Sequence, residues 1–230
     1  MYGFLDNCSF WYIIPAIKTT VFYLMEILIW AAICFFSGSV PWAVLIGTWF
    51  SKSDVRNIGD RNPGAANAWK LGGWIPGLLS VVLEVAKSLV PVYIALQLLG
   101  QPDGFVDQIG LTVILLAPVL GHAWSPFLKF RGGKALAVTW GSWIAITGGM
   151  AFPVALIVLG LIHTLQKNHA ITVTFCLVGF LLIFLPLNVQ YYLIMFWVSN
   201  LAVVMYKHRE EYSKGLMFRD WITGSKRRTG

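Results

Sequence analysis

The sequence contains few charged residues. Only 12% of its 230 residues are Asp, Glu, Lys or Arg, whereas 57% are hydrophobic and 15% are aromatic. Because soluble domains carry about 25% charged residues, this composition excludes an ordinary soluble protein and predicts an integral membrane protein. The net charge of +7 is typical of cytoplasmic loops that face anionic lipid. We therefore expect membrane lipids, and no nucleic acid, among its partners.

Cysteine is also scarce. Cys8, Cys34 and Cys176 lie far apart and form no C-x-x-C pair, which excludes a sequence-encoded zinc site or disulfide framework. The first 17 residues contain no Lys or Arg and no small-residue cleavage site, which argues against a cleaved signal peptide. Long apolar segments are what remains as the main structural signal.

These segments predict an all-α integral membrane protein with seven transmembrane helices, two of them short. A spanning helix needs about 20 apolar residues to cross about 30 Å of hydrocarbon. The first expected helix is broken at the sequence SGSVP. The expected helices lie near residues 21–50, 74–99, 108–126, 134–149, 152–166, 170–186 and 189–206.

The stretch 134–166 allows either one long helix or two short helices joined at GGMAFP, and the charge pattern decides between them. One helix would place the loop 127–134 and the tail after Tyr206 on opposite sides, against the positive-inside rule. Two helices place every Lys and Arg except Lys18 and Lys87 on one side. The pattern therefore predicts an N-terminus outside and a C-terminus in the cytoplasm.

Three regions follow from this arrangement. Residues 1–20 form an aromatic segment that we expect at the outer interface, with docking onto a partner as an alternative. Residues 21–207 form the seven-helix domain. Residues 208–230 form a basic cytoplasmic tail, which anionic lipid attracts.

The unusual polar residues gather in three cytoplasmic clusters, at 37–73, 121–138 and 206–211. Each lies where an expected helix begins or ends, and there unpaired backbone N–H groups and the helix dipole favour phosphate oxygens. Lys134 directly follows a glycine pair and adds a cation to such a cradle. The spacing G-x-x-x-x-G-K-[ST] of a Walker loop is absent.

Two further sets of polar residues leave alternatives open. Glu84 and Lys87 lie about one turn apart within an expected span, where they either line a polar cavity or only neutralise each other. His122 is either a structural hydrogen-bonding residue or a catalytic one, and His163 and His169 fit a structural, interfacial role. His208 can reach the other clusters, although the basic run around it also fits a topology anchor.

In order and spacing the clusters resemble the bacterial acyl-phosphate:glycerol-3-phosphate acyltransferase family. The stretches that carry the resemblance are GSVP (38–41), RNIGDRNPGAAN (56–67), GHAWSPFLKFRGGK (121–134) and YKHRE (206–210). The resemblance implies a multi-pass enzyme of the bacterial plasma membrane with a cytoplasmic active face. It also implies acyl phosphate and glycerol 3-phosphate as substrates, lysophosphatidic acid as product, and neither acyl-CoA, a metal nor another cofactor.

The resemblance also implies residue roles. Lys134 and His208 are the expected catalytic residues: Lys134 and the amides of the glycine pair hold a phosphate, and His208 orients or deprotonates the glycerol hydroxyl or binds phosphate. No covalent enzyme nucleophile is needed, since acyl phosphate is already activated. The expected phosphate-binding and substrate-binding residues are Ser39, Arg56, Asn62, Gly64, Asn67, Lys70, Lys87, Gly132, Gly133 and Arg209.

Four positions depart from the family pattern. Two of these departures, Asp60 and Glu211, add an acid. The added acids weaken phosphate binding unless they pair with Arg61 or Arg209. The departures therefore leave a second hypothesis open, a non-catalytic relative that serves as a lipid-binding or accessory subunit of a membrane complex. A transporter is a third hypothesis, which the missing internal repeat disfavours. The departures are Asp60 for a serine, Lys70 for an arginine, Ala135 for a glycine and Glu211 for an asparagine.

Overall fold

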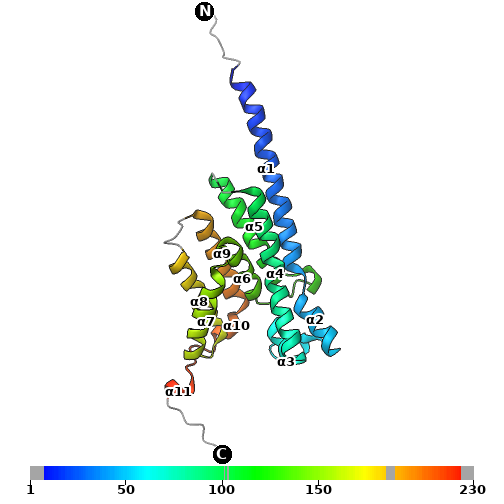
Figure 1. Ribbon diagram of the computed structural model, residues 1–230, viewed down its shortest axis with the longest axis vertical. Helices are drawn as coiled ribbons and strands as arrows, with labels where there is room; N and C mark the ends of the chain where they lie inside the picture. Colours follow the sequence, from blue (N-terminus) through cyan, green and yellow to red (C-terminus); the bar gives the residue numbers. More distant parts are fainter. Residues whose placement is uncertain (1–7, 101, 103, 185–189, 224–230) are drawn as a thin grey trace, which may run out of the picture.

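A computed structural model describes residues 8–100, 102, 104–184 and 190–223 of the chain (Figure 1). Within these residues the fold is all-helical and contains no β-strand, only an isolated antiparallel bridge between Gln166 and Phe218. The α-helices are α1 (Cys8–Ser39), α2 (Trp42–Ser51), α3 (Ala65–Gly72), α4 (Trp74–Leu99), α5 (Phe105–Ala123), α6 (Leu136–Ile146), α7 (Ala151–Leu165), α8 (His169–Phe184), α9 (Tyr191–Lys207), α10 (Arg209–Tyr212) and α11 (Asp220–Thr223). Short 3₁₀ helices span Val55–Asn57 and Pro126–Leu128.

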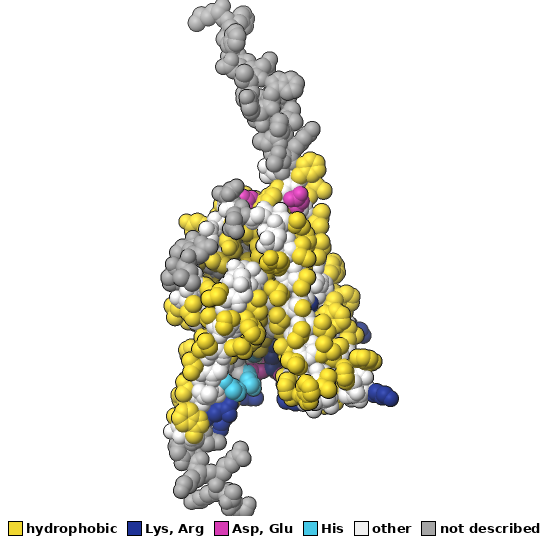
Figure 2. All heavy atoms as spheres, viewed as in Figure 1, with side chains coloured by type: hydrophobic (Ala, Val, Ile, Leu, Met, Phe, Trp, Pro, Cys, Tyr) yellow, Lys and Arg dark blue, Asp and Glu magenta, His cyan; other side chains and the backbone are white. Residues whose placement is uncertain are grey.

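Three segments are long and apolar enough to cross a membrane, judged by length and composition. They are Thr20–Ser51, Trp74–Leu99 and Phe105–Leu128, and the apolar helices α6, α7 and α8 are shorter. Hydrophobic side chains cover most of the visible face of the bundle (Figure 2). The all-helical membrane fold therefore agrees with the sequence prediction.

Helix α1 begins at Cys8, earlier than the sequence pattern predicts. It runs without a break to Ser39 and extends beyond the end of the bundle (Figure 1). The expected aromatic segment 1–20 is thus helical from Cys8 onward, while residues 1–7 lie outside the described residues. Its place at the outer interface stays a prediction.

The predicted break after α1 is confirmed. Pro41 precedes α2, and proline restricts the residue before it to extended conformations, so α1 ends and α2 starts a new direction. Above this break α1 packs against α5 at backbone contact: a Cβ on Gly38 would lie 2.3 Å from the carbonyl oxygen of Pro118, and one on Gly121 would lie 2.1 Å from that of Phe35. Glycine at both positions permits this close approach.

The region 134–166 forms two helices, as the charge pattern predicts. A turn separates α6 from α7, and in it Gly148 and Gly149 have φ angles of +57° and +96°, which glycine adopts at low cost. Trp143 of α6 is 2% exposed and contacts Phe180 and Phe196 at centroid distances of 5.3 and 5.4 Å. These aromatic contacts join α6 to α8 and α9.

Candidate active site

Two chambers that share part of their walls lie at the end of the bundle where α9 ends. We call the smaller one, of about 250 Å³, the inner chamber and the larger one, of about 450 Å³, the outer chamber. Figure 2 shows histidine, lysine and acidic side chains gathered where this face is hollowed. The residues that line both chambers are Asp60, Lys70, Lys134, His169, His208 and Glu211.

Lys134 is the centre of the shared wall. It follows the glycine pair at the start of α6, and its ammonium lies 2.5 Å from Oδ2 of Asp60 and also pairs with Oε1 of Glu211. The two acids come from segments far apart in the chain, the loop before α3 and helix α10. Both acids therefore pair with Lys134, a partner that differs from Arg61 and Arg209, the two arginines considered from the sequence.

The ion pair between Asp60 and Lys134 keeps both of its groups charged. Burial opposes the charge of Asp60, but the hydrogen bond and positive charge of Lys134 outweigh it and lower the pKa of that carboxyl to about 2. Burial likewise opposes the charge of Lys134, but Asp60 and Glu211 outweigh it and raise the lysine pKa. A substrate phosphate would therefore meet an ammonium that is charged and already paired with two carboxylates.

His208 closes the other side of the shared wall. Its side chain caps the end of α9 and is only 1% exposed. Nδ1 lies 2.8 Å from the carbonyl oxygen of Val204, which can only accept a hydrogen bond, so Nδ1 carries the proton and Nε2 is left as an acceptor. Burial lowers the pKa of His208, which makes the neutral ring the dominant form at pH 7.

The loop before α3 shapes the inner chamber. Asn62, Gly64, Asn67 and Lys70 all line it, as predicted for substrate-binding residues. The side-chain amide of Asn67 donates to Oδ1 of Asp60 at 2.9 Å and to the carbonyl oxygen of Asn62 at 2.9 Å. Its Oδ1 is buried, and among the described residues no hydrogen-bond donor reaches it.

A buried charged cluster supports the chamber from within the bundle. The carboxylate of Glu84 lies 2.6 Å from the ammonium of Lys87 and 3.1 Å from Nδ1 of His122. The other carboxylate oxygen accepts from the backbone N–H of Ala43 at 3.1 Å, and Lys87 donates to the carbonyl oxygen of Val40 at 2.7 Å. These contacts fix the break between α1 and α2 onto α4 and α5.

The structure does not bring three predicted binding residues to these chambers. The guanidinium of Arg56 pairs with Asp54 at 2.5 Å in an exposed turn. The hydroxyl of Ser39 donates to the carbonyl oxygen of Phe35 at 2.7 Å, inside the α1–α5 contact. Lys87 lines a separate apolar groove between α1 and α4. The sequence shows a polar residue near a helix end, but it does not show whether that residue contacts another part of the protein or a ligand.

The glycine pair and Arg209 also differ from prediction. The backbone N–H of Gly133 donates to the carbonyl oxygen of His122 at 3.1 Å, so this amide is not open to a phosphate. Gly132 and Arg209 line a third cavity, of about 400 Å³, which also borders Lys134. The guanidinium of Arg209 lies 4.6 Å from the ring centre of Tyr206, and this stacking directs it away from the two chambers.

Sequence reasoning missed several residues of the chamber walls. His169, assigned an interfacial role, lines both chambers, and Lys167, Asn168 and Lys214 line the outer one. The available signal was the predicted topology, because it places the 163–169 loop on the same side as Lys134 and His208.

Comparison with known proteins identifies the family. A family model described as glycerol-3-phosphate acyltransferase matches residues 28–217. The glycerol-3-phosphate acyltransferase 1 of Thermotoga maritima is 32% identical over 197 residues, which cover 79% of this chain and 95% of the relative. The glycerol-3-phosphate acyltransferase of Neisseria meningitidis is 30% identical over 200 residues, covering 85% of this chain and 96% of the relative.

Two solved structures share the fold. Both are crystal structures of PlsY (YgiH), an integral membrane glycerol 3-phosphate acyltransferase, one in a glycerol 3-phosphate form and one in a lysophosphatidic acid form. They superpose with TM-scores of 0.70 and 0.72 at 24% sequence identity, over 89% of this chain and 96% and 95% of theirs. By sequence and by fold, this chain belongs to the glycerol-3-phosphate acyltransferase family of membrane enzymes.

Proposed function

We propose that this acyltransferase moves a fatty acyl group from an acyl phosphate to glycerol 3-phosphate, forming lysophosphatidic acid and inorganic phosphate at the two chambers. The observation that carries the proposal is the shared wall: Lys134 and His208, which lie far apart in the sequence, line the same two chambers. Family membership supplies the acceptor, and the donor is the one that the sequence resemblance implies.

The chemistry needs no covalent enzyme intermediate. The glycerol hydroxyl attacks the acyl carbonyl carbon, the new C–O ester bond forms, and the bond from that carbon to the phosphate oxygen breaks. Nε2 of His208, which has a free lone pair in this tautomer, accepts the hydroxyl proton. Lys134 stabilises the negative charge that develops on the departing phosphate.

For Lys134 to act on a phosphate, the substrate must displace Asp60 or Glu211 from the ammonium. Both carboxylates lie on movable side chains that are partly exposed, at 48% and 20% for their side chains. Surface ion pairs contribute about 0.2–1 kcal/mol, and the pair with the half-exposed Asp60 comes nearest to that case, so a dianionic phosphate can replace Asp60. The acids thus set the affinity of the site and leave its chemistry possible.

We also propose the topology and location predicted from the sequence. The chain would cross the plasma membrane of a bacterium seven times, with the N-terminus outside and both chambers facing the cytoplasm. The start of helix α1 and helix α11 lie at opposite ends of the bundle (Figure 1), which supports an odd number of crossings. The soluble acceptor would enter from the cytoplasm, and the acyl chain would lie among the helices in the bilayer.

An assay of the purified full chain tests the function. Palmitoyl phosphate and labelled glycerol 3-phosphate should yield labelled lysophosphatidic acid and one phosphate per turnover. Lys134→Ala should abolish the reaction, while Lys52→Ala, which removes a lysine at the end of α2, should leave it unchanged. No turnover of any acyl phosphate by folded wild-type protein would contradict the proposal and favour the accessory-subunit hypothesis. The observation that favours this alternative is that Asp60 and Glu211 already neutralise Lys134.

A further inference from the structure

The chain beyond α9 folds back onto the bundle. We call residues 209–219 the return segment. The backbone N–H of Lys167 donates to the carbonyl oxygen of Met217 at 2.7 Å, and that of Arg219 donates to the carbonyl oxygen of Leu165 at 3.1 Å. These main-chain bonds hold the end of the return segment against the turn between α7 and α8.

Asn168, in the same turn, holds the return segment from inside. It is 3% exposed, and its side-chain amide donates to the carbonyl oxygens of Glu211 at 2.9 Å and Gly215 at 2.8 Å. Its Oδ1 accepts from the backbone N–H of Ala170 at 3.1 Å, and the backbone N–H of Thr172 donates to its carbonyl oxygen at 3.1 Å, so it also caps the start of α8. Every polar atom of this side chain therefore has a partner within the protein.

Glu211 is the residue that this contact places. Its carbonyl oxygen accepts from Asn168, while its carboxylate pairs with Lys134. It lies in α10, a helix of four residues of which none is buried, whereas isolated helices shorter than about 12 residues are marginal in water. The position of Glu211 therefore depends on contacts that anchor α10 from outside, such as the one with Asn168.

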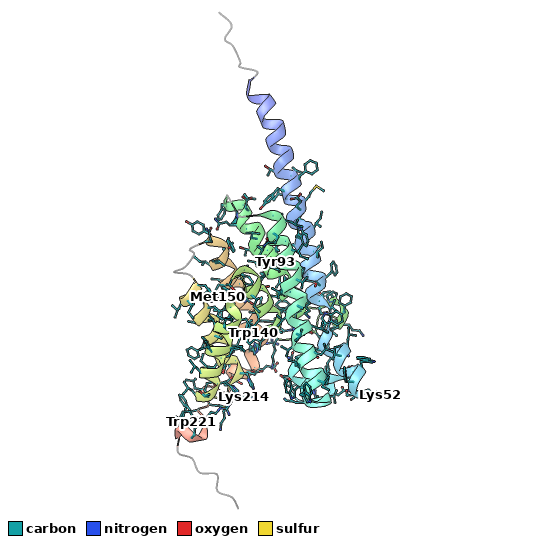
Figure 3. The ribbon with its side chains drawn as sticks, in the orientation of Figure 1. Lys52, Tyr93, Trp140, Met150, Lys214 and Trp221 are labelled. Atoms are coloured by element: carbon teal, nitrogen blue, oxygen red, sulfur yellow. The ribbon has the colours of Figure 1, made fainter. Side chains whose placement is uncertain are left out.

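Further contacts of the same turn come from residues beyond Met217, where the match to the family model ends. The guanidinium of Arg219 donates to the carbonyl oxygen of His163 at 2.8 Å, and the indole N–H of Trp221 (Figure 3) donates to that of Thr164 at 3.0 Å. These bonds hold the turn between α7 and α8 in place. The basic tail expected from the sequence is therefore folded onto the bundle up to this point.

We infer that Asn168 is a positioning residue for the reaction: by holding the return segment it keeps the Glu211 carboxylate on Lys134, and it thus limits how much of that ammonium a substrate can use. The inference rests on the proposed function, because its measure is the affinity for glycerol 3-phosphate. The physical reason is conformational entropy. A carboxylate on an anchored main chain loses little freedom when it pairs, whereas one on a loose segment must first be ordered. Without Asn168 the ion pair is weaker, and phosphate displaces Glu211 more easily.

Asn168→Ser in the full chain tests the inference. Serine is also a good helix cap, but it has no amide to donate to Glu211 and Gly215. Steady-state kinetics at saturating acyl phosphate should give a KM for glycerol 3-phosphate about threefold lower than that of wild type, as for a weakened and partly exposed ion pair. The double variant with Glu211→Gln should have the KM of Glu211→Gln alone, because Asn168 acts only through that carboxylate.

Thr147→Val is the matched control. The hydroxyl of Thr147 donates to the carbonyl oxygen of Trp143 at 2.7 Å and accepts from the backbone N–H of Ala151 at 2.9 Å, so this variant also loses two bonds to the main chain, at the other end of α7. Its KM should match wild type, and an equal fall would indicate general loosening of the bundle and overturn the inference. An unchanged or raised KM for Asn168→Ser, or effects that multiply in the double variant, would also overturn it.

Arg219→Gln provides a second measurement if Asn168→Ser does not fold. This variant removes an exposed side chain that holds the turn between α7 and α8. It should therefore lower the KM in the same direction, and it should add nothing to the effect of Glu211→Gln. A KM equal to that of wild type would contradict the positioning role.

Calorimetric titration with glycerol 3-phosphate separates this inference from the proposed function. If the wild type binds glycerol 3-phosphate without turning over acyl phosphate, the proposed function fails, and a lower Kd for Asn168→Ser still upholds the positioning role. If the wild type turns over while Asn168→Ser leaves both Kd and KM unchanged, the proposed function stands and the positioning role fails.

Discussion

Asp60 and Glu211 determine how much of the Lys134 charge a substrate can use. Both carboxylates pair with the same ammonium, so each competes with phosphate for it. Asp60→Asn and Glu211→Gln remove one competitor each while keeping the shape of the side chain. We expect the KM for glycerol 3-phosphate to fall about threefold in each variant, as befits a partly exposed pair.

Glu210→Gln is the matched control for this prediction. Its carboxylate also lines the outer chamber, but it lies 4.0 Å from Arg209 rather than on Lys134, so its KM should match wild type. Steady-state kinetics at saturating acyl phosphate measure the effect. A rise in KM for the Asp60 and Glu211 variants would mean that the acids position Lys134 instead of competing for it.

His208 should give the reaction a characteristic pH dependence. Burial lowers its folded-state pKa below the usual 6.5, so the base is neutral and active at pH 7. As pH falls through that lowered pKa the ring becomes protonated, Nε2 no longer accepts a proton, and kcat/KM should decline. The rate should be flat between about pH 6.5 and 8, and His208→Gln should abolish the acidic limb; a persistent limb in that variant would assign it to another group.

Ala135 has a strained backbone at the chamber wall. Its φ angle is +62° and its side chain is 1% exposed, a conformation that costs a non-glycine residue about 1–2 kcal/mol. Ala135→Gly should therefore raise the free energy of unfolding by about 1 kcal/mol, measured by denaturant titration in detergent. Ala137→Gly, two residues later inside α6, should lower it by about the same amount; a loss in both would contradict the strain.

At the scale of helices, the Glu84–Lys87 pair links the break after α1 to α4. Both side chains are only 2% exposed, and removing Lys87 leaves the buried Glu84 carboxylate with only His122 and the backbone N–H of Ala43 beside it. Lys87→Met should destabilise the bundle by about 3 kcal/mol, whereas Glu84→Gln combined with Lys87→Met should lose much less. Denaturant titration of the four proteins of this double-mutant cycle measures the coupling, and additive losses would show that the two residues act independently.

The helices were more predictable from the sequence than the site. Apolar length and the proline and glycine positions placed α4, α5, α6 and α7 within a few residues, because those features act locally. The contacts of Arg56, Ser39 and Asp60 depend instead on which segments meet in space. Asp60 illustrates the limit: its sequence position flagged a change in the phosphate seat, but only the fold shows that Lys134, and not Arg61, is its partner.

At the scale of the whole molecule, the charge asymmetry predicts that α6 and α7 each cross the membrane, whereas both helices are short for a crossing. The rise of about 1.5 Å per residue gives α6 about 16 Å and α7 about 22 Å, each less than the roughly 30 Å of hydrocarbon. The pair can therefore cross as two short spans, or enter and return as a re-entrant hairpin. Either way the number of crossings is odd, so the positions of the two ends do not distinguish seven spans from five.

Labelling of single cysteines in intact cells with a membrane-impermeant maleimide separates these topologies. In a background with Cys8, Cys34 and Cys176 replaced by alanine, we expect Phe105→Cys at the start of α5 to react from outside. Ser213→Cys, directly after α10, should react only after permeabilisation.

Labelling at Met150 distinguishes seven spans from five. This residue is 61% exposed in the α6–α7 turn and is labelled in Figure 3. Seven spans require Met150→Cys to react from outside like the Phe105 variant, since the turn then reaches the outer surface. Protection of Met150→Cys both before and after permeabilisation would place the turn inside the bilayer and reduce the count to five. Because α6 starts at the Lys134 wall in both cases, the cytoplasmic position of the chambers depends on Ser213→Cys, and labelling of that variant from outside would contradict it.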